Sequence, residues 1–235
     1  AQQLGLVAGA EPTRTWKPGK VWVARDGIFP KSGKCLNTYA PFESSLEAVA
    51  HLLLSVDPRI QHYVCQPPPL HYWMPGNDGG MDKREYTPDF VALTRDSRLI
   101  VIDAKASFFA NDPKWLNREP FIRQAYRRDY DAELLVWNEH DLRAEPRLSN
   151  ARTMYRHRFA PSDRGCDFAL MGALEERGGQ STIGELCDCL AGSTGYDAPH
   201  VFGAIMRAGL EGLVWLEASA RYALPTIVSL PETGA

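Results

Sequence analysis

The sequence predicts an α/β protein, an α/β/α sandwich followed by a small domain of helices and a hairpin. Three observations predict this fold class. Residues 86–105 contain two apolar, β-branched segments joined by a polar turn, which is typical of a hairpin. Helical periodicity appears before it at residues 42–55 and after it at residues 121–130, so helices are available to cover the sheet. The composition then changes near Asp163, where we expect a second domain.

Composition narrows the class of protein. The chain has 235 residues and a net charge of -3, which suits one ordinary domain and a smaller one. This mild acidity argues against indiscriminate nucleic-acid binding, although a local basic face is compatible with it. The five cysteines are scattered and odd in number, so we expect reduced thiols in a cytoplasmic protein. No apolar run approaches the roughly 18 residues that span a membrane, so we expect no membrane partner.

The N-terminal part is expected to be irregular. Residues 1–18 are small and polar with two prolines, which predicts a flexible arm before a first domain at residues 19–160. A basic Pro/Gly-rich loop follows at residues 27–34. Its Lys31 and Lys34 either contact phosphate near an active site or are solvated, and the loop by itself favours solvation.

The helix expected at residues 42–55 contains an acid with two interpretations. Ser44 and Glu47 have the spacing of a capping box, in which the glutamate bonds the first turn of the helix. Alternatively, Glu47 is a metal ligand. This second interpretation is favoured because the hairpin that follows the helix also carries acids. His51, farther along the helix, is interpreted as a surface or packing residue.

Ionisable residues gather on one face of the predicted hairpin. Its turn pairs Leu93 with Leu99 and Asp89 with Asp103, and side-chain alternation puts Lys105 on the face of Asp103. The opposite face is apolar, which predicts central strands. Two neighbouring buried carboxylates are costly unless a cation compensates them, so we expect a metal ion. Lys105 has a simpler alternative role, an ion pair that neutralises Asp103.

The remaining elements complete both domains. Strands are expected at residues 60–66, 70–74 and 133–137, and the helix at residues 121–130 carries Arg123 and Arg127. After residue 163 we expect helices at residues 167–176, 182–190 and 198–211, with Ser181 as an N-cap and Pro199 in a first turn. Strands at residues 213–216 and 222–224 would then form a hairpin. This order predicts a winged-helix-like domain at residues 163–228 and a tail at 229–235.

The helix expected at residues 198–211, the third of that domain, indicates whether the domain reads DNA. A DNA-reading helix would carry several basic or amide side chains, whereas this one offers Arg207 among small and apolar residues. Protein docking or a structural role is therefore at least as well supported as DNA reading. The tail sequence Leu-Pro-Glu-Thr-Gly at residues 230–234 matches a sortase pattern, which we interpret as chance or an added tag.

The hairpin motif resembles that of a known superfamily. Asp89 after a proline, followed by Asp103-x-Lys105, is the pattern of the PD-(D/E)xK, restriction-endonuclease-like nucleases. Over roughly residues 25–158 the flanking segments are similar to those of the TnsA-like transposon endonucleases. The similar segments are Gly27-Ile-Phe-Pro, Phe42-Glu-Ser-Ser-Leu-Glu47, Asp57-Pro-Arg-Ile, Gln66-Pro67, Tyr86-Thr-Pro-Asp89-Phe, Asn138-Glu-His-Asp-Leu-Arg143, Arg147-Leu-Ser-Asn150 and Met154-Tyr-Arg156.

This resemblance implies a restriction-endonuclease-like fold and a function. Such an enzyme cuts double-stranded DNA at the 5′ ends of a mobile element in the bacterial cytoplasm, where it is nucleoid-associated when bound to DNA. A DDE-type transposase acts on the other strand, and an AAA+ ATPase regulator contacts the endonuclease. By the same resemblance Glu47, Asp89, Asp103 and the Ala104 carbonyl hold Mg²⁺, for which Mn²⁺ can substitute, and Lys105 is the catalytic lysine. Relatives often have Glu or Gln where this chain has the shorter Asp103.

Two questions stay open at the level of sequence. The arginines of residues 143–158 either follow a DNA backbone or form the solvated face of a linking helix. The residues expected to contact DNA are Lys31, Lys34, Arg123, Arg127, Arg147, Arg152 and Arg156. The alternative functions are a stand-alone restriction or repair nuclease, and a winged-helix DNA-binding or assembly protein whose first domain is only a scaffold.

Overall fold

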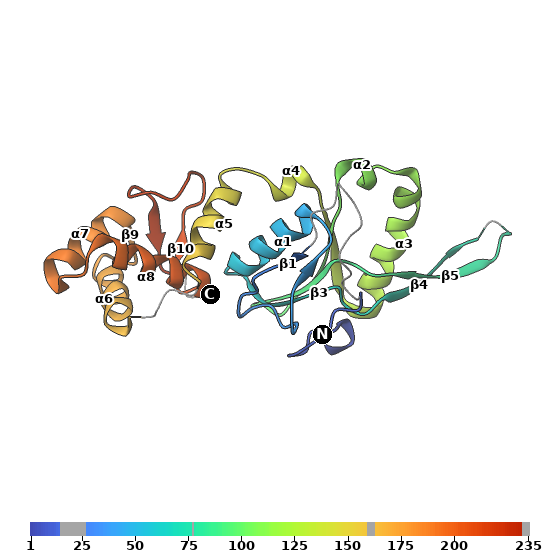
Figure 1. Cartoon of the computed structure of the whole chain (residues 1–235), viewed down its shortest axis with the longest axis horizontal. Coiled ribbons are helices and arrows are strands. Elements are labelled where there is room, and N and C mark those ends of the chain that lie inside the picture. The colour runs from blue at the N-terminus through green and yellow to red at the C-terminus, as the bar shows by residue number, and fades with distance from the viewer. Residues whose placement is uncertain (15–26, 77, 159–162, 232–235) are drawn as a thin grey trace. The chain divides into compact units, whose positions relative to one another are not determined.

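The chain divides into two compact units. The computed structural model describes residues 1–14, 27–76, 78–158 and 163–231 (Figure 1). Unit 1 comprises Ala1–Ser55 and Arg59–Arg143, and unit 2 comprises Val56–Pro58 and Ala144–Ala235. The parts of the predicted arm, first domain and tail at residues 15–26, 159–162 and 232–235 lie outside the described residues.

The boundary between the units lies earlier than the predicted position near residue 160. Helix α5 (Arg147–Arg156), expected to belong to the first domain, belongs to unit 2. Its Asn150 is buried, donates to the Ala220 carbonyl (2.9 Å) and accepts from the Tyr222 N–H (2.9 Å). These bonds connect α5 to the segment between the last two described strands of unit 2. The sequence pattern did not indicate this long-range contact.

Unit 1 is built on a four-stranded mixed sheet with the order β3-β6-β7-β8. Its strands are β3 (Ile60–Cys65), β6 (Phe90–Thr94), β7 (Leu99–Ala104) and β8 (Ala132–Trp137). The predicted hairpin is formed by β6 and β7, in which Leu93 pairs with Leu99, and both are central strands as predicted. Strands β7 and β8 are parallel, and the other pairs are antiparallel.

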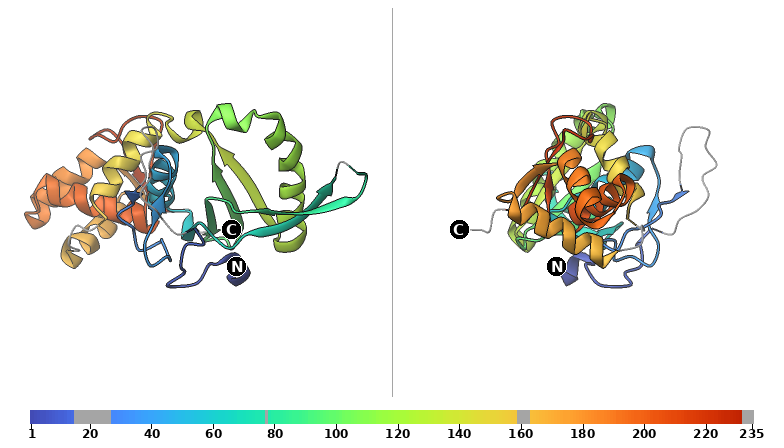
Figure 2. Two further views of the ribbon diagram at one scale, coloured as in Figure 1. Left: turned by 45° about the vertical axis from the view of Figure 1, so that its right-hand side comes forward. Right: turned by 90° about the vertical axis from the view of Figure 1, so that its left-hand side faces the viewer.

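Helices cover both faces of this sheet (Figure 2). On one face, helix α1 (Ser45–Val56) places the His51 ring 4.7 Å from the Phe90 ring. On the other face, Ile122 and Tyr126 of helix α3 (Pro113–Tyr130) share a buried cluster with Val91, Val101 and Leu134. Because Phe90 and Val91 alternate along β6, the two helices lie on opposite faces. The predicted α/β architecture is therefore present.

Helix α3 begins well before the predicted start at residue 121. Asp112 is its N-cap and accepts a hydrogen bond from the Lys114 N–H (2.8 Å), and Pro113 occupies the first turn. Pro120 lies inside the helix and is exposed. Short elements complete the unit: η1 (Gln2–Leu4), β1 (Gly27–Ile28), β2 (Pro41–Phe42), α2 (Ser107–Ala110) and α4 (Glu139–Leu142).

A second, two-stranded sheet projects from unit 1. Strand β4 (Leu70–Pro75) was expected at residues 70–74. It pairs along its full length with β5 (Met81–Tyr86), a strand that the sequence did not predict. In Figure 1 this hairpin extends to the right, beyond helix α3. Most of β5 is exposed, and four of its residues in a row are charged. It therefore lacks the alternation of apolar and polar residues that identifies a half-buried strand in a sequence.

The described N-terminal residues contradict the predicted flexible arm. Leu4 and Leu6 are buried in the main core cluster. The Thr13 hydroxyl lies within hydrogen-bond distance of the carbonyls of Gln66 (2.9 Å) and Pro67 (3.0 Å). Residues 1–14 are therefore packed against unit 1 instead of being free in solvent.

Unit 2 combines helices with a three-stranded antiparallel sheet of order β10-β11-β9. Its elements after α5 are α6 (Arg164–Glu176), β9 (Gln180–Thr182), α7 (Ile183–Thr194), α8 (Ala198–Glu211), β10 (Trp215–Leu216) and β11 (Ile227–Ser229). The helix predicted at residues 198–211 has those bounds, with Pro199 in its first turn. No helix in the described part of the chain is long and apolar enough to cross a membrane.

Two local predictions for unit 2 are wrong. The strand that pairs with β10 is at residues 227–229 and not at 222–224. The N-cap of α7 is Thr182 and not Ser181, because Thr182 and Glu185 form a reciprocal capping box. Ser181 is instead a buried strand residue whose hydroxyl donates to Glu185 (3.0 Å).

Candidate active site

The residues predicted to form a site line one cavity in unit 1. Glu47, Asp89, Asp103, Ala104 and Lys105 all border a cavity of about 470 Å³, here called the acid pocket. They come from α1, from the residue before β6, and from the end of β7 with the residue after it. The hairpin register and the position of α1 over the sheet therefore bring together the candidates that the sequence singled out.

Asp89 is fixed by the backbone around it. It is 8% exposed, and its Oδ2 accepts a hydrogen bond from the Ala104 N–H (2.8 Å) on the neighbouring strand. Its own carbonyl accepts from the Gln66 N–H (2.7 Å) after β3. Phe90 pairs with Ile102, so Asp89 lies one step beyond this pair, opposite Asp103, as the predicted register requires.

Asp103 and Lys105 form the ion pair predicted as the alternative role of Lys105. Lys105 Nζ lies 2.8 Å from Asp103 Oδ2, so the two side chains share a face of β7. The contact is an ion pair without hydrogen-bond geometry, and the buried Asp103 Oδ2 accepts no hydrogen bond from the residues that the structure describes. The ammonium also lies 4.4 Å from the centre of the Trp115 ring, a cation–π contact from α3. Lys105 is therefore oriented from two sides.

Glu47 has the capping role and also borders the acid pocket. The Ser44 hydroxyl accepts from the Glu47 N–H (3.1 Å), as in a capping box. The Glu47 carboxylate accepts from the N–H of Glu43 (2.8 Å), one residue before the expected partner. The cap uses Oε2, so the two interpretations of Glu47 are compatible.

The surroundings of Asp89 and Glu47 in the acid pocket disfavour the ionised form of both side chains. Burial raises the pKa of Asp89 well above its ordinary value, and the charges of Asp103 and Glu47 raise it further. Burial also raises the pKa of Glu47, against the opposing effect of its hydrogen bonds from Glu43 and Ser44. The nearby Tyr86 hydroxyl is buried and has no hydrogen-bond partner in the described part of the chain, and burial and the charges of Asp103 and Asp89 raise its pKa. Acidic groups are therefore crowded where solvent is scarce, and the loss of their protons is disfavoured.

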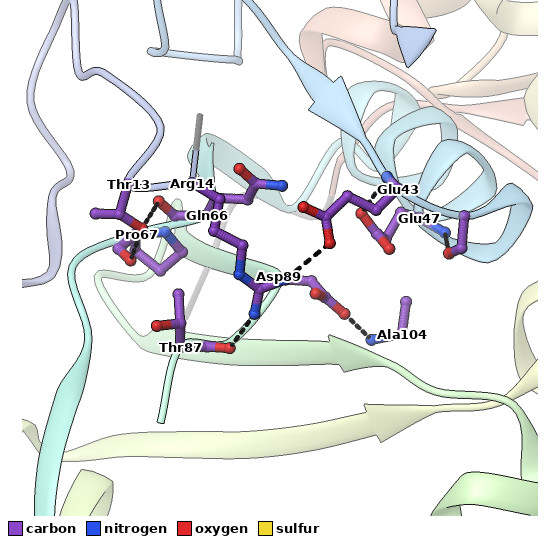
Figure 3. A network of polar contacts seen from close by, with 10 residues as sticks. Thr13, Arg14, Glu43, Glu47, Gln66, Pro67, Thr87, Asp89 and Ala104 are labelled. Atoms are coloured by element: carbon purple, nitrogen blue, oxygen red, sulfur yellow. Dashed lines mark hydrogen bonds and ion pairs between the residues drawn. The ribbon is translucent and has the colours of Figure 1, made fainter. Parts of the chain in front are cut away.

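Sequence reasoning missed two arginines that border the acid pocket. Arg14 donates to Glu43 Oε2 (3.1 Å) and to the Thr87 carbonyl (3.0 Å), as Figure 3 shows. Arg118 of α3 donates from Nε to the Tyr72 hydroxyl (2.9 Å). No motif marks either residue, because one lies in a segment predicted to be flexible and the other in the unpredicted part of α3.

The donor chemistry of the acid pocket fits a hard divalent cation held by two carboxylates. Mg²⁺ prefers oxygen ligands and commonly uses one or two carboxylates with several waters. A cation between Asp89 and Asp103 would offset the burial and the repulsion by neighbouring acids that raise the pKa of Asp89. Among the described residues, no three His, Cys, Asp or Glu side chains form a ready-made metal site. Direct binding by Glu47 or the Ala104 carbonyl stays a prediction.

The residues predicted to contact DNA lie in different environments. Arg123 is used within unit 1, where it donates to the Leu134 carbonyl and pairs with Glu119 (2.5 Å each). Lys31 donates to the Asn37 carbonyl (2.6 Å), and Lys34 is half-buried. Arg127 is exposed on α3, and three more cations are exposed on α5 in unit 2, namely Arg147, Arg152 and Arg156.

His51 is a packing residue, one of the two roles predicted for it. Its ring is fully buried, stacked on Phe29 at 5.0 Å, and bonded to the Tyr63 hydroxyl and the Pro41 carbonyl (3.2 Å each). Burial lowers its pKa to about 4. It therefore stays neutral at physiological pH and takes no part in the acid pocket.

Comparison of the chain with models of known protein families and with curated protein sequences gave no match.

Proposed function

We propose that the chain is a metal-dependent DNA endonuclease of the TnsA-like type, with a restriction-endonuclease-like first domain. It would cut the non-transferred strand at the 5′ ends of a transposable element. The observation that carries this proposal is the acid pocket, in which Asp89, Asp103 and Lys105 meet at the end of a central hairpin. The sequence segments similar to TnsA-like enzymes surround these residues and give the proposal its substrate class.

Each residue of the acid pocket has a chemical role in this proposal. Asp89 and Asp103 would hold Mg²⁺, which lowers the pKa of a bound water and stabilises charge on a phosphate. Lys105, fixed by Asp103 and Trp115, would place its ammonium beside the scissile phosphate and stabilise the negative charge that develops there. Glu47 would accept hydrogen bonds from water in the pocket with the oxygen that the cap leaves available.

A purely structural role for unit 1 is less well supported. Buried carboxylates with raised pKa values lower the stability of the folded state at neutral pH. A scaffold gains nothing from such a cluster, whereas a metal site requires it. Natural proteins keep destabilising groups of this kind chiefly at functional sites.

Unit 2 would be a winged-helix-like docking domain. After α5, its order of helix, strand, two helices and two strands suits that fold. Arg207 of helix α8 is ion-paired with Asp167 of α6 (2.8 Å), and its side chain has an exposed fraction of 14%. This internal use of the cation favours a protein partner over base reading. In the proposed system the partners are a DDE-type transposase and an AAA+ ATPase regulator, in the bacterial cytoplasm.

The proposal is tested by cleavage of DNA that carries the ends of the element. We expect Mg²⁺-dependent cuts at the 5′ ends when the partner transposase is present, and no cuts in EDTA. Mn²⁺ should replace Mg²⁺. Equally vigorous cutting of unrelated DNA by the isolated chain would indicate a stand-alone nuclease. No cutting under any condition would contradict the endonuclease proposal.

A further inference from the structure

A second cavity in unit 1 continues from the acid pocket. It has a volume of about 670 Å³ and lies between the β4–β5 hairpin and the start of α3. Arg118 and Glu85 border both cavities, so the two are neighbours. The second cavity is here called the cationic pocket, and its lining residues are Met74, Pro75, Arg84, Glu85, Lys114, Asn117 and Arg118. The charged residues that line it are therefore three cations, Arg84, Lys114 and Arg118, and one carboxylate, Glu85.

Arg118 connects the two cavities. Its Nε donates to the buried Tyr72 hydroxyl (2.9 Å), which fixes the plane of the guanidinium group. The terminal nitrogens of Arg118 have no bond to protein in the described part of the chain. A guanidinium group held by one edge presents its remaining donors to a ligand, and phosphate oxygens match this geometry.

The other two cations are available for the same ligand. Lys114 is exposed, and its ammonium has no bond to protein among the described residues. Arg84 pairs with Asp82 (2.6 Å), but both side chains are largely exposed, at 52% and 42%. An exposed pair of this kind contributes at most about 1 kcal/mol, so a phosphate can replace Asp82 as the partner of Arg84.

Strand register separates Arg84 from its neighbour Lys83. Arg84 pairs with Tyr72, whose hydroxyl bonds to Arg118, so Arg84 lies on the face of the hairpin toward α3. Lys83 pairs with the exposed Trp73 and therefore lies on the opposite face. Of these two adjacent cations of the same strand, Arg84 is among the residues that line the cationic pocket and Lys83 is not.

We propose that the cationic pocket binds a backbone phosphate of the DNA strand that is cut in the acid pocket. The proposal rests on the endonuclease function proposed above and adds the path of the substrate. The strand would pass from the acid pocket along Arg118 toward Lys114 and Arg84. Phosphate contacts of this kind position a strand without reading its sequence, so the cationic pocket orients DNA and leaves the choice of site to a partner.

The test is equilibrium binding of a fluorescently labelled DNA duplex to the full-length chain, measured by anisotropy in EDTA so that no strand is cut. Lys114→Ala and Arg84→Ala should each weaken binding severalfold at low salt. Each should also reduce the slope of log K against log salt concentration by about one, since one phosphate contact is lost. Lys83→Ala is the matched control and should retain the affinity and the slope of the wild type.

Wild-type affinity and slope in both Lys114→Ala and Arg84→Ala would overturn the proposal, as would an equal loss in Lys83→Ala. Arg118→Ala removes the partner of a buried hydroxyl, so its folding is checked by circular dichroism. If that variant unfolds, binding by Lys114→Ala and Arg84→Ala decides the question. Because binding is measured without metal, its outcome is separate from cleavage. Normal cleavage with unchanged binding in the variants contradicts only the cationic pocket, whereas absent cleavage by the wild type contradicts the endonuclease.

Discussion

Asp89 combines burial with repulsion from other acids. Burial and the charges of Asp103 and Glu47 raise its pKa, and the hydrogen bond from the Ala104 N–H compensates only in part. In the absence of a cation, the unfolded chain therefore loses this proton at lower pH than the folded chain. The free energy of unfolding accordingly falls as pH rises above the ordinary pKa of an aspartate toward the raised one.

Asp89→Asn should stabilise the metal-free protein at neutral pH. The amide oxygen can still accept the Ala104 N–H, while the repelled charge is gone. One pKa unit corresponds to about 1.4 kcal/mol, so a gain on the order of 1 kcal/mol is expected in urea unfolding with EDTA. Asp96→Asn is the control, because hydrogen bonds from Thr94 and Arg98 lower the pKa of that exposed turn residue. A destabilised Asp89→Asn would contradict the electrostatic account.

The effect of pH on stability through His51 has the opposite sign to that through Asp89. Its folded pKa of about 4 lies below the ordinary value of 6.5, so the unfolded chain binds the proton first as pH falls. Its contribution therefore makes unfolding free energy rise between about pH 4 and pH 6.5, by about 3 kcal/mol. The difference in unfolding free energy between the wild type and His51→Gln should grow by this amount over that window. A difference that stays constant with pH would contradict the assignment.

At the scale of elements, the central hairpin is the part that could be predicted most completely. Alternation along β6 and β7 gives the pairing of Leu93 with Leu99, and from it the meeting of Asp89, Asp103 and Lys105. Apolar strands with two covered faces carry a strong sequence signal. Strand β5 carries little signal, because four adjacent charged residues on an exposed hairpin show no alternation.

Helix ends and distant segments were harder to predict. The start of α3 is polar and contains Pro120, so its apolar pattern becomes clear only after residue 121. Arg14 reaches the acid pocket from a segment that lacks periodicity altogether. Its position depends on Leu4 and Leu6 entering the core, which is a tertiary effect that a local pattern does not contain.

The first turn of α1 allows the two roles of Glu47 to be separated. In Glu47→Gln the amide oxygen can still accept the Glu43 N–H, so the cap is kept while the charge is lost. The unfolding free energy should stay within about 0.5 kcal/mol of the wild type or rise, because burial no longer opposes a charge. Strand cleavage should fall. Undiminished cleavage would assign Glu47 to the cap alone.

At the scale of the whole molecule, the position of α5 decides where the chain can be divided. The composition change near residue 163 is real, but α5 buries Leu148, Ala151 and Met154, and Asn150 bonds to residues 220 and 222. Composition does not reveal such long-range bonds. The sequence could therefore predict two domains but not their boundary.

A fragment of residues 144–235 should consequently unfold cooperatively at a higher temperature than a fragment of residues 164–235. The shorter fragment loses two large buried side chains, Leu148 and Met154, each worth about 1.5–3 kcal/mol of burial. Thermal unfolding followed by circular dichroism measures both. Equal midpoints would show that α5 is not part of the folded core of unit 2.

The central claim is that the acid pocket binds a metal ion and cuts DNA. Strand-specific mapping of nicks at the 5′ ends of the element, in a plasmid incubated with this chain and the partner transposase, tests it most directly, because in the proposed system the transposase cuts the other strand. The wild type should nick in Mg²⁺ and not in EDTA. Asp89→Asn should be folded and inactive, whereas Asp96→Asn, in the turn of the same hairpin, should nick at the wild-type rate. Nicking by Asp89→Asn at the wild-type rate would contradict the account.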